Sequence, residues 1–303
     1  MTTATGKLFV IGEYAVLYGS GAVLVPVPHQ AFVRIIEDDR NQLTVRNKAT
    51  RTFSLSEAVT TQPLLSAVVE TLDCEEELNS ISLSLDTSAF FYKGRKLGLG
   101  SSAALTAALV KALRPGLPQS SQLTLAISAH QLFQSGHGSG ADVALALMGA
   151  PVFFRRDYPA ANHIFPADLH MLAIWSGEPA STPNYINKVE AWRSNNPDRF
   201  EYHIERLCKC TEDFLLAENT TSQLNKINLY GRYLYDFSED SNIKFYNAPH
   251  ITLQKEVESA GCIYKPSGAG GGDFGIAFSE DEDILSSLTK SIHQEGRLAF
   301  RIR

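Results

Sequence analysis

Apolar and polar positions alternate in short runs through the first half of the chain, and this period of two predicts strands. The alternation from Lys7 to Ile11 ends in a turn at Gly12–Glu13, and residues 81–85 carry Ile or Leu at every second position. The run at 24–36 is dominated by Val, Ile, Leu and Phe, so it predicts a strand with an edge or bulge at its two prolines. Residues 151–154 predict one further short strand.

Helical spacing of apolar residues separates these runs, and near residue 165 the pattern changes to long amphipathic helices. The helices predicted in the first half cover 64–72, 103–113, 123–133 and 141–148. The second half adds helices within about 183–235, at 251–260 and at 284–294, and strands at 171–175, 275–278 and 297–302. We therefore expect an α+β fold (α/β, two layers) with two domains, residues 1–165 and 166–303.

Length and composition agree with this picture. The chain has 303 residues, about twice the ~150 of a typical domain, and 44% hydrophobic with 20% charged residues is ordinary for a soluble globular protein. Its longest apolar stretch without charge, residues 143–154, is too short for a bilayer, which takes ~20 residues. Lys7 and Glu13 precede any long apolar run, so we expect neither a signal peptide nor a membrane partner.

Charge and cysteine content limit which ligands the protein is expected to bind and in which cellular compartment it is expected to lie. The net charge is −6, and no basic block predicts a nucleic-acid partner, so local lysines and backbone amides would have to hold any anionic ligand. Four scattered cysteines do not form a disulfide framework, and Cys208 and Cys210 have no second Cys or His pair to complete a metal site. We expect reduced thiols and a cytoplasmic protein.

Three segments carry candidate chemistry. Residues 98–104, Gly-Leu-Gly-Ser-Ser-Ala-Ala, precede a predicted helix and could cradle a phosphate, although a serine-capped helix after a glycine turn has the same pattern. Residues 267–275 hold five glycines between two apolar strands, which favours a backbone that wraps closely around a ligand over a linker. Asp142 opens an apolar helix after a glycine-rich turn, where it could stabilise the helix dipole or act as a base or metal ligand.

These segments resemble the ordered motifs of the GHMP small-molecule kinase superfamily. The first is Gly6-Lys7-Leu8 with residues 12–17, the second is the loop at 98–104, and the third is the loop at 267–275; together they bracket residues 6 to 278. Within the superfamily, Lys96-Leu97-Gly98, residues 175–182 and Asp273 resemble the phosphomevalonate kinases. Mevalonate kinases usually lack the Pro-Ala-Ser at 179–181 and that aspartate.

The resemblance implies a two-domain fold with its active site in the cleft between the domains, ATP and Mg²⁺ as cofactors, and phosphomevalonate as the small-molecule partner. Lys7 and Asp142 would be catalytic, and Ser102 would bind the metal. The expected ATP phosphate-binding residues are Gly98, Leu99, Gly100, Ser101, Ser102 and Ala103. The expected substrate-binding residues are Lys96, His137, Ser181, Thr182, Ser267, Gly268, Ala269, Gly270 and Asp273.

One position departs from the family pattern. Mevalonate kinases place a magnesium-binding Glu eleven residues before the catalytic aspartate, and Gln131 occupies that position here. A neutral amide is a poorer ligand for Mg²⁺ than a carboxylate, but Mg²⁺ keeps several waters and relies on substrate phosphates. The expected reaction is ATP-dependent phosphorylation of (R)-5-phosphomevalonate to the 5-diphosphate in isoprenoid synthesis.

Other interpretations remain open at this point. A mevalonate kinase or another small-alcohol kinase would share the motifs, and a catalytically silent metabolite sensor could share the fold. Intact Lys7, Ser102 and Asp142 argue against the sensor. His130 and His137 are separated by a helix-breaking glycine and do not predict a metal pair. Trp192 is expected in an apolar core stripe rather than in a base-stacking platform.

Overall fold

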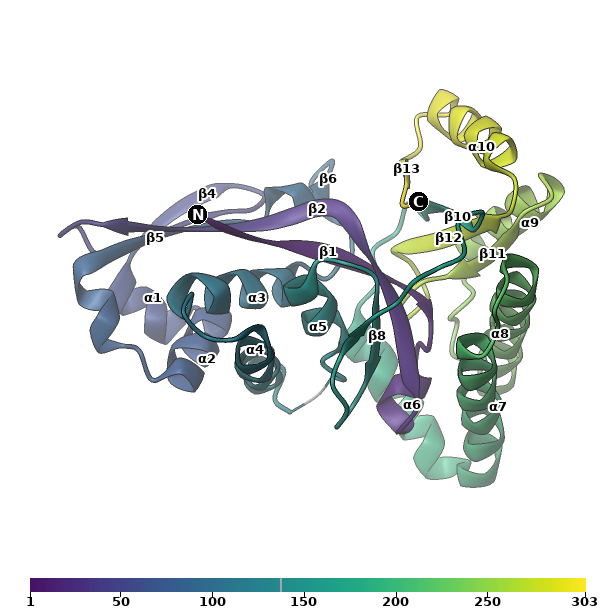
Figure 1. The fold of residues 1–303 in the computed structure, drawn as a ribbon, viewed down its shortest axis with the longest axis horizontal. Coiled ribbons are helices and arrows are strands. Elements are labelled where there is room, and N and C mark those ends of the chain that lie inside the picture. Colours follow the sequence, from purple (N-terminus) through teal and green to yellow (C-terminus); the bar gives the residue numbers. More distant parts are fainter. Residues whose placement is uncertain (137) are drawn as a thin grey trace. The chain divides into compact units, whose positions relative to one another are not determined.

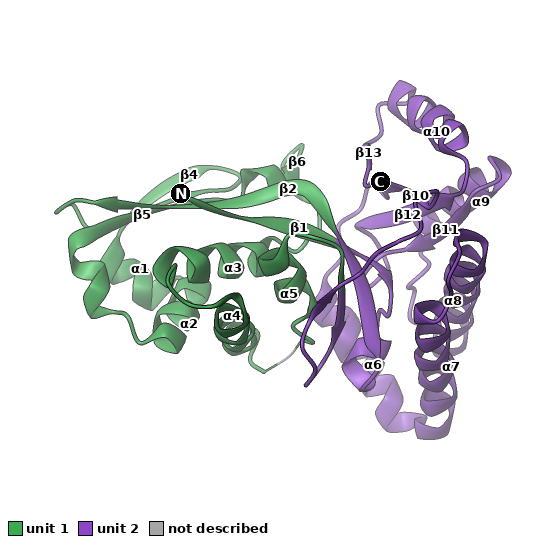
Figure 2. Cartoon of the chain, in the orientation of Figure 1, with its two compact units in different colours: residues 1–7, 26–152 green, residues 8–25, 153–303 purple. Residues whose placement is uncertain are grey.

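The first two strands each take part in both of the units into which the chain divides (Figure 1 and Figure 2). A computed structural model describes residues 1–136 and 138–303. Residues 1–7 and 26–152 form the first unit, and residues 8–25 and 153–303 form the second. β1 (Thr2–Ile11) and β2 (Gly21–Glu37) therefore begin in one unit and end in the other. The predicted domains 1–165 and 166–303, and the cleft between them, stay predictions.

In the first unit, four strands lie in the order β4-β3-β5-β2, and β1 also pairs with β2. β3 (Gln42–Arg46) runs antiparallel to β4 (Thr50–Ser54) and parallel to β5 (Ile81–Asp86), and β5 runs antiparallel to β2. The register places Val33 of β2 opposite Leu85 of β5, and both side chains are buried. The apolar positions that predicted β2 and β5 thus include residues on the face turned to the core.

Five helices cover one face of these strands (Figure 1). They are α1 (Leu55–Thr61), α2 (Pro63–Leu72), α3 (Ser101–Leu113), α4 (Gln119–Phe133) and α5 (Ala141–Met148). Ala103, Ala104, Ala107 and Ala108 of α3 are fully buried, because small side chains let neighbouring elements approach this helix from several sides. Between β5 and α3 run the short strands β6 (Phe91–Tyr92) and β7 (Arg95–Lys96). Three 3₁₀ turns lie at Ala15–Tyr18, Glu76–Ser80 and Ser88–Phe90.

The second unit contains an antiparallel sheet in the order β11-β12-β10-β13. Its strands are β10 (His170–Trp175), β11 (Ile263–Pro266), β12 (Phe274–Ser279) and β13 (Ala299–Arg301). Helices α9 (Ala248–Ser259) and α10 (Glu282–Gln294) bury Val257 and Ile292 in one cluster with Ile174 and Ala277 of the sheet. β8 (Val152–Arg155) and β9 (Ala161–Asn162) follow β2 in the order of the larger sheet.

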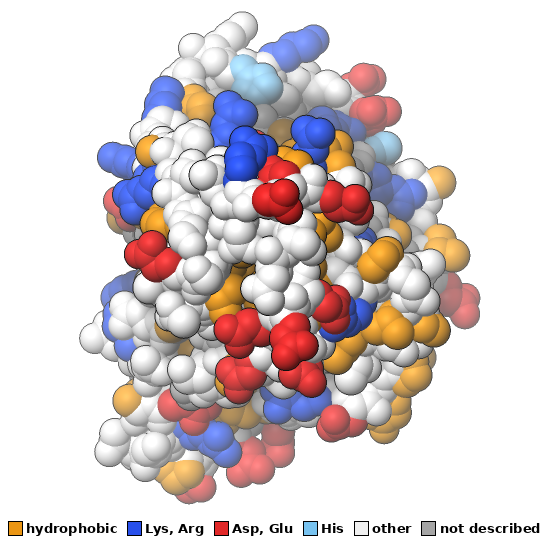
Figure 3. All heavy atoms as spheres, turned by 90° about the vertical axis from the view of Figure 1, so that its left-hand side faces the viewer, with side chains coloured by type: hydrophobic (Ala, Val, Ile, Leu, Met, Phe, Trp, Pro, Cys, Tyr) orange, Lys and Arg blue, Asp and Glu red, His pale blue; other side chains and the backbone are white. Residues whose placement is uncertain are grey.

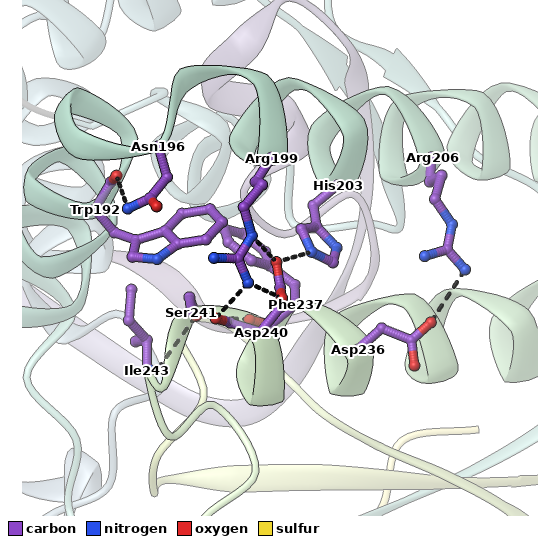
Figure 4. A network of polar contacts seen from close by, with 10 residues as sticks. All are labelled: Trp192, Asn196, Arg199, His203, Arg206, Asp236, Phe237, Asp240, Ser241 and Ile243. Carbon is purple, nitrogen blue, oxygen red and sulfur yellow. Dashed lines mark hydrogen bonds and ion pairs between the residues drawn. The ribbon is translucent and has the colours of Figure 1, made fainter.

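Three long helices complete the second unit: α6 (Thr182–Asn195), α7 (Pro197–Leu215) and α8 (Thr220–Ser241). Asp240 of α8 accepts hydrogen bonds from Arg199 Nε and His203 Nε2 of α7, each at 3.0 Å (Figure 4). The His203 ring stacks on Phe237 with centroids 5.0 Å apart, and Trp192 packs on the same phenyl ring at 5.5 Å. Trp192 is half-buried and lies in an aromatic cluster with Arg199 over its ring, so the expected apolar core position is met only in part.

The apolar pattern predicted most of these elements, but β3, β4 and α1 and the two-residue strands β6, β7 and β9 were not predicted. For β4 the reason is that Thr50–Ser54 is mostly exposed and alternates no apolar residues. None of the described helices is long and apolar enough to cross a membrane. All four cysteines are free. On the face drawn in Figure 3, the described acidic and basic side chains both occur without a continuous basic surface.

Candidate active site

The turn before α3 brings the backbone of residues 98–100 against Lys7 of β1. Gly98 (φ 71°) and Gly100 (φ 79°) adopt the left-handed conformation that favours glycine. The Lys7 N–H donates to the Leu99 carbonyl at 2.9 Å, and the Lys7 side chain lies over Gly100. A Cβ added at Gly100 would sit 3.1 Å from Lys7 Cγ and 3.2 Å from Lys7 Cε. Glycine at 100 is therefore needed for both the turn and the approach of the lysine.

The N-terminus of α3 begins at a residue that cannot cap it. Its N-cap is Gly100, which has no side chain to accept from the helix N–H groups, and no acidic residue lies in the first turn. Among the described residues, no acceptor bonds the N–H groups at this end, which belong to Gly100, Ser101, Ser102 and Ala103. Four backbone donors and the positive end of the helix dipole thus converge beside Lys7, which is the arrangement that binds phosphate.

The N-terminus of α5 differs, because side chains next to it accept from two of its N–H groups. The Ser139 hydroxyl accepts from the Ala141 N–H at 3.2 Å, and Asp142 Oδ1 accepts from the Val143 N–H at 3.0 Å. Asp142 also places a negative charge in the first turn of α5. The contrast between the two helices singles out α3 as the anion-binding end.

His130 is a further candidate site residue, which sequence reasoning missed. Its Nε2 lies 3.1 Å from Ser102 Oγ, and the imidazole is almost fully buried in α4. Burial lowers the pKa of His130, and the nearby charge of Asp142 acts in the opposite direction, so the ring is neutral at pH 7. The sequence shows a histidine on a mainly apolar helix, a pattern that a core histidine shares.

The third motif lies in the second unit, and its serine is bonded to β1. Ser267 Oγ accepts from the Phe9 N–H at 2.8 Å and donates to the Phe9 carbonyl at 3.0 Å. Substrate binding through this hydroxyl would require one of these bonds to break. In this structure the Ser267 hydroxyl therefore holds the start of the loop against β1.

Asp273 connects the same loop to the segment before α6. Its Oδ1 accepts from the Ala180 N–H at 3.0 Å, and its N–H donates to the Glu178 carbonyl at 2.7 Å. A Cβ at the neighbouring Gly272 would lie 2.8 Å from that same carbonyl. Asp273, which was expected to bind substrate, thus holds residues 178–180 against the loop.

Beneath the loop lies a buried ion pair that the sequence did not reveal. Lys265 Nζ bonds the Glu13 carboxylate and donates to the Pro266 carbonyl at 2.9 Å, and the Tyr230 hydroxyl donates to the Glu13 carbonyl at 2.5 Å. Burial raises the pKa of Glu13 and lowers the pKa of Lys265, while each charge opposes the shift of the other. Glu13 lies in the turn between β1 and β2, and Lys265 lies two residues before the glycine-rich loop. The ion pair therefore links that turn to the start of the loop.

The remaining predicted substrate residues are placed as follows. Lys96 is exposed in β7, Ser181 is the residue before the first turn of α6, and Thr182 begins that helix. Both hydroxyl-bearing residues are exposed, and Ser181 makes no side-chain capping bond. His137 lies outside the described residues. The predicted site residues therefore fall into two groups, with Lys7, Lys96, the 98–103 turn and Asp142 in the first unit and the others described in the second.

For a magnesium ion the described residues offer few ligands. Among them, no cluster of three His, Cys, Asp or Glu side chains could hold a metal. Ser102 in the first turn of α3 lies 3.1 Å from His130, whose pKa burial lowers and the charge of Asp142 raises, and Gln131 is half-buried in α4. A sparse oxygen set fits Mg²⁺, which binds through one or two protein ligands together with substrate phosphates and water.

Comparison with known proteins finds a matching family domain and similar proteins. Residues 66–150 match the family described as GHMP kinases N terminal domain. A phosphomevalonate kinase of Streptomyces sp. (strain CL190) is 27% identical over 92% of this chain and 89% of its own length. One from Saccharolobus solfataricus is 28% identical over 92% of this chain and 90% of its length. Streptococcus pneumoniae phosphomevalonate kinase, solved with phosphomevalonate and AMPPNP, matches with a TM-score of 0.81 at 20% identity over 99% of this chain and 98% of that one.

The turn at 98–103, His130 and Asp142 all lie inside the matched domain, whereas Lys7 and the 267–273 loop lie outside it. Both sequence relatives match 92% of the chain, so the similarity extends well beyond that domain. The predicted resemblance is thereby confirmed: residues 66–150 match the GHMP kinase N-terminal domain, and the chain as a whole has the GHMP kinase fold and is similar to phosphomevalonate kinases.

Proposed function

We propose that this protein transfers the γ-phosphoryl group of ATP to the phosphate of (R)-5-phosphomevalonate and releases ADP and the 5-diphosphate. The sequence similarity to two phosphomevalonate kinases over nine-tenths of the chain supports this acceptor. The GHMP kinase domain at 66–150 supports ATP as the donor. The four free thiols agree with a reducing cytoplasm as the place of this reaction.

The observation that carries the proposal is the uncapped N-terminus of α3 beside Lys7. Phosphoryl transfer asks chiefly for positioning and for charge stabilisation, and backbone N–H groups supply both without a proton transfer. Donors at Gly100, Ser101 and Ser102 would hold the nucleotide phosphates, and the Lys7 ammonium would offset their charge. α5 is less suited to this, because side chains accept from two of its first N–H groups and Asp142 adds a negative charge to its first turn.

An ionised acceptor explains how the site could work without a strong base. The second pKa of a phosphate monoester is about 6, so its attacking oxygen is already an anion at neutral pH. The chief difficulty is then repulsion between two anionic phosphates, and Lys7 is the residue that we propose to reduce it. Asp142 would be needed less as a base than in a kinase that deprotonates an alcohol.

Ser102 and Asp142 are the residues we propose to hold Mg²⁺, together with the nucleotide phosphates and water. When bound, the ion neutralises charge on the transferred phosphoryl group. His130 would orient the Ser102 hydroxyl, because the neutral imidazole reaches it at 3.1 Å. The exposed hydroxyls of Ser181 and Thr182 would bind the acceptor's own phosphate.

The test is ADP release across mevalonate, phosphomevalonate, galactose and homoserine under identical conditions. We expect kcat/KM for phosphomevalonate to exceed that for each alcohol by at least ~100-fold, since only one acceptor brings the phosphate that the site is built to bind. A preference for mevalonate would replace the proposal with an alcohol kinase. Absence of turnover with all four acceptors, in folded protein, would favour a sensor.

A further inference from the structure

The glycine-rich loop, residues 267–273, has its carbonyl groups held by side chains from outside the loop. The Tyr14 hydroxyl donates to the Ala269 carbonyl at 2.6 Å. Asn247, the residue before α9, donates from Nδ2 to the Gly271 carbonyl at 3.1 Å while its Oδ1 caps the helix. Tyr14 is buried, so its bond to the loop is shielded from water.

His250 holds a third carbonyl of the loop, and its bonds fix its tautomer. Its Nε2 lies 2.8 Å from the Gly272 carbonyl, which can only accept, so Nε2 carries the proton. Its Nδ1 lies 2.7 Å from the Tyr264 hydroxyl and accepts from it, because burial lowers the pKa of His250 to about 4 and leaves the ring neutral. Both ring nitrogens of this fully buried residue are therefore used.

The N–H groups of the loop show the opposite pattern. Gly271 donates to the Phe245 carbonyl at 2.7 Å, but within the described chain no acceptor bonds the N–H groups of Ala269, Gly270 or Gly272. Gly270 and Gly272 are buried, where an unpaired N–H costs free energy unless a ligand satisfies it. Held carbonyls and unbonded N–H groups make a backbone that binds anions.

Close packing keeps the loop in this arrangement. A Cβ at Gly270 would lie 2.8 Å from the Phe245 carbonyl oxygen, and one at Gly271 would overlap the Tyr185 hydroxyl at 1.7 Å. Gly268 (φ 89°) and Gly270 (φ 73°) are left-handed. The loop cannot turn its N–H groups elsewhere without losing the contacts that hold its carbonyls.

We infer that Tyr14, Asn247 and His250 are positioning residues for the acceptor. By holding three carbonyls of the loop, they leave its N–H groups as donors for an anionic phosphate of the bound acceptor. None of the three touches the substrate in this assignment, since the Tyr14 and His250 donors bond the loop and Asn247 Nδ2 bonds both the loop and Glu178 Oε2 at 3.2 Å. The identity of the acceptor in this inference rests on the proposed function. The ability of the loop to bind an anion does not depend on that function.

Tyr14→Phe removes one donor and keeps the buried ring, and Tyr246→Phe is its matched control. The Tyr246 hydroxyl is also buried and also donates to a carbonyl, that of Gly231 in α8, at 3.2 Å. We expect Tyr14→Phe to raise KM for phosphomevalonate about five- to tenfold and to leave KM for ATP within about twofold. Tyr246→Phe should change neither, while both variants lower Tm by similar amounts. Equal KM values in the two variants would overturn the inference.

His250 supplies a rescue test. His250→Gln retains an N–H donor at the end of a flexible side chain, whereas His250→Leu removes it. We expect KM for phosphomevalonate within about threefold of wild type for Gln and at least about tenfold higher for Leu. Equal KM values for Gln and Leu contradict the inference, and if the Leu variant does not fold, the Tyr14→Phe comparison decides.

A binding experiment separates this inference from the proposed function. Protein labelled with ¹⁵N-glycine is titrated with inorganic pyrophosphate, and the amide signals of Gly270 and Gly272 are followed by NMR. We expect both to shift, with Kd about fivefold higher in Tyr14→Phe and unchanged in Tyr246→Phe. Amides that do not shift overturn the inference even if phosphomevalonate is phosphorylated. Shifting amides without turnover support it and refute the proposed function.

Discussion

Replacing His250 by Gln should reduce the sensitivity of the fold to acid. The imidazole is buried and bonded at both nitrogens, and burial, the largest cause, lowers its pKa from 6.5 to about 4. In the unfolded chain the pKa returns to 6.5. Below pH 6.5 the unfolded chain therefore binds more protons at this position than the folded protein does, so the free energy of unfolding falls as the pH falls.

The magnitude follows from the two pKa values. At pH 5 the unfolded imidazole is about 1.5 pH units below its pKa, while the folded imidazole at about 4 is still neutral. At about 1.36 kcal/mol per unit, His250 removes about 2 kcal/mol of stability between pH 7.5 and pH 5. Below about pH 4 the folded protein also takes up the proton, and this loss levels off.

Urea unfolding, followed by tryptophan fluorescence, measures this loss of stability in the second unit of the chain. Both tryptophans of the chain, Trp175 and Trp192, lie in the second unit with His250. We expect the wild type to lose about 2 kcal/mol more than His250→Gln between pH 7.5 and pH 5, because glutamine does not titrate. Equal losses in the two proteins would refute the buried, neutral imidazole and with it the tautomer that we assign.

The remaining predictions concern the catalytic residues and the acceptor phosphate. Ser102→Ala should lower kcat at least tenfold through loss of a metal contact; near-normal turnover at saturating magnesium would exclude Ser102 from catalysis. Changing Ser181 and Thr182 together to Ala should raise KM for phosphomevalonate and leave KM for ATP nearly unchanged, and an effect on ATP alone would contradict their assignment. Lys7→Ala should damage kcat more than Asp142→Asn, since the acceptor is already ionised; the reverse order, with folding verified by circular dichroism, would favour an alcohol acceptor.

The sequence predicted those parts of the fold whose pattern is local. Periodicity placed α3, α5 and β10 within one or two residues of their observed bounds, because each buries a regular set of apolar side chains. It missed β4, whose residues are mostly exposed and which is held by pairing with β3. Pairing between distant segments leaves little trace in the local pattern of such a strand.

The candidate site shows the same division. Glycines and serines of the phosphate loop were predictable, because left-handed turns and helix starts favour these residue types. His130, His250 and the Glu13–Lys265 pair were not, since their roles depend on partners 14 to 252 positions away in the chain. A buried histidine bonded to a loop and one that merely fills the core look alike in a single sequence.

The most direct test of the central claim is the ³¹P NMR spectrum of the product formed from ATP and phosphomevalonate. Transfer to a phosphate creates a P–O–P bond, so the account predicts two coupled doublets from a diphosphate ester, growing as the monoester signal disappears and ADP accumulates. A second uncoupled monoester signal would mean that a hydroxyl was phosphorylated. That result, or ADP release with the phosphomevalonate signal unchanged, would contradict transfer to the acceptor's phosphate.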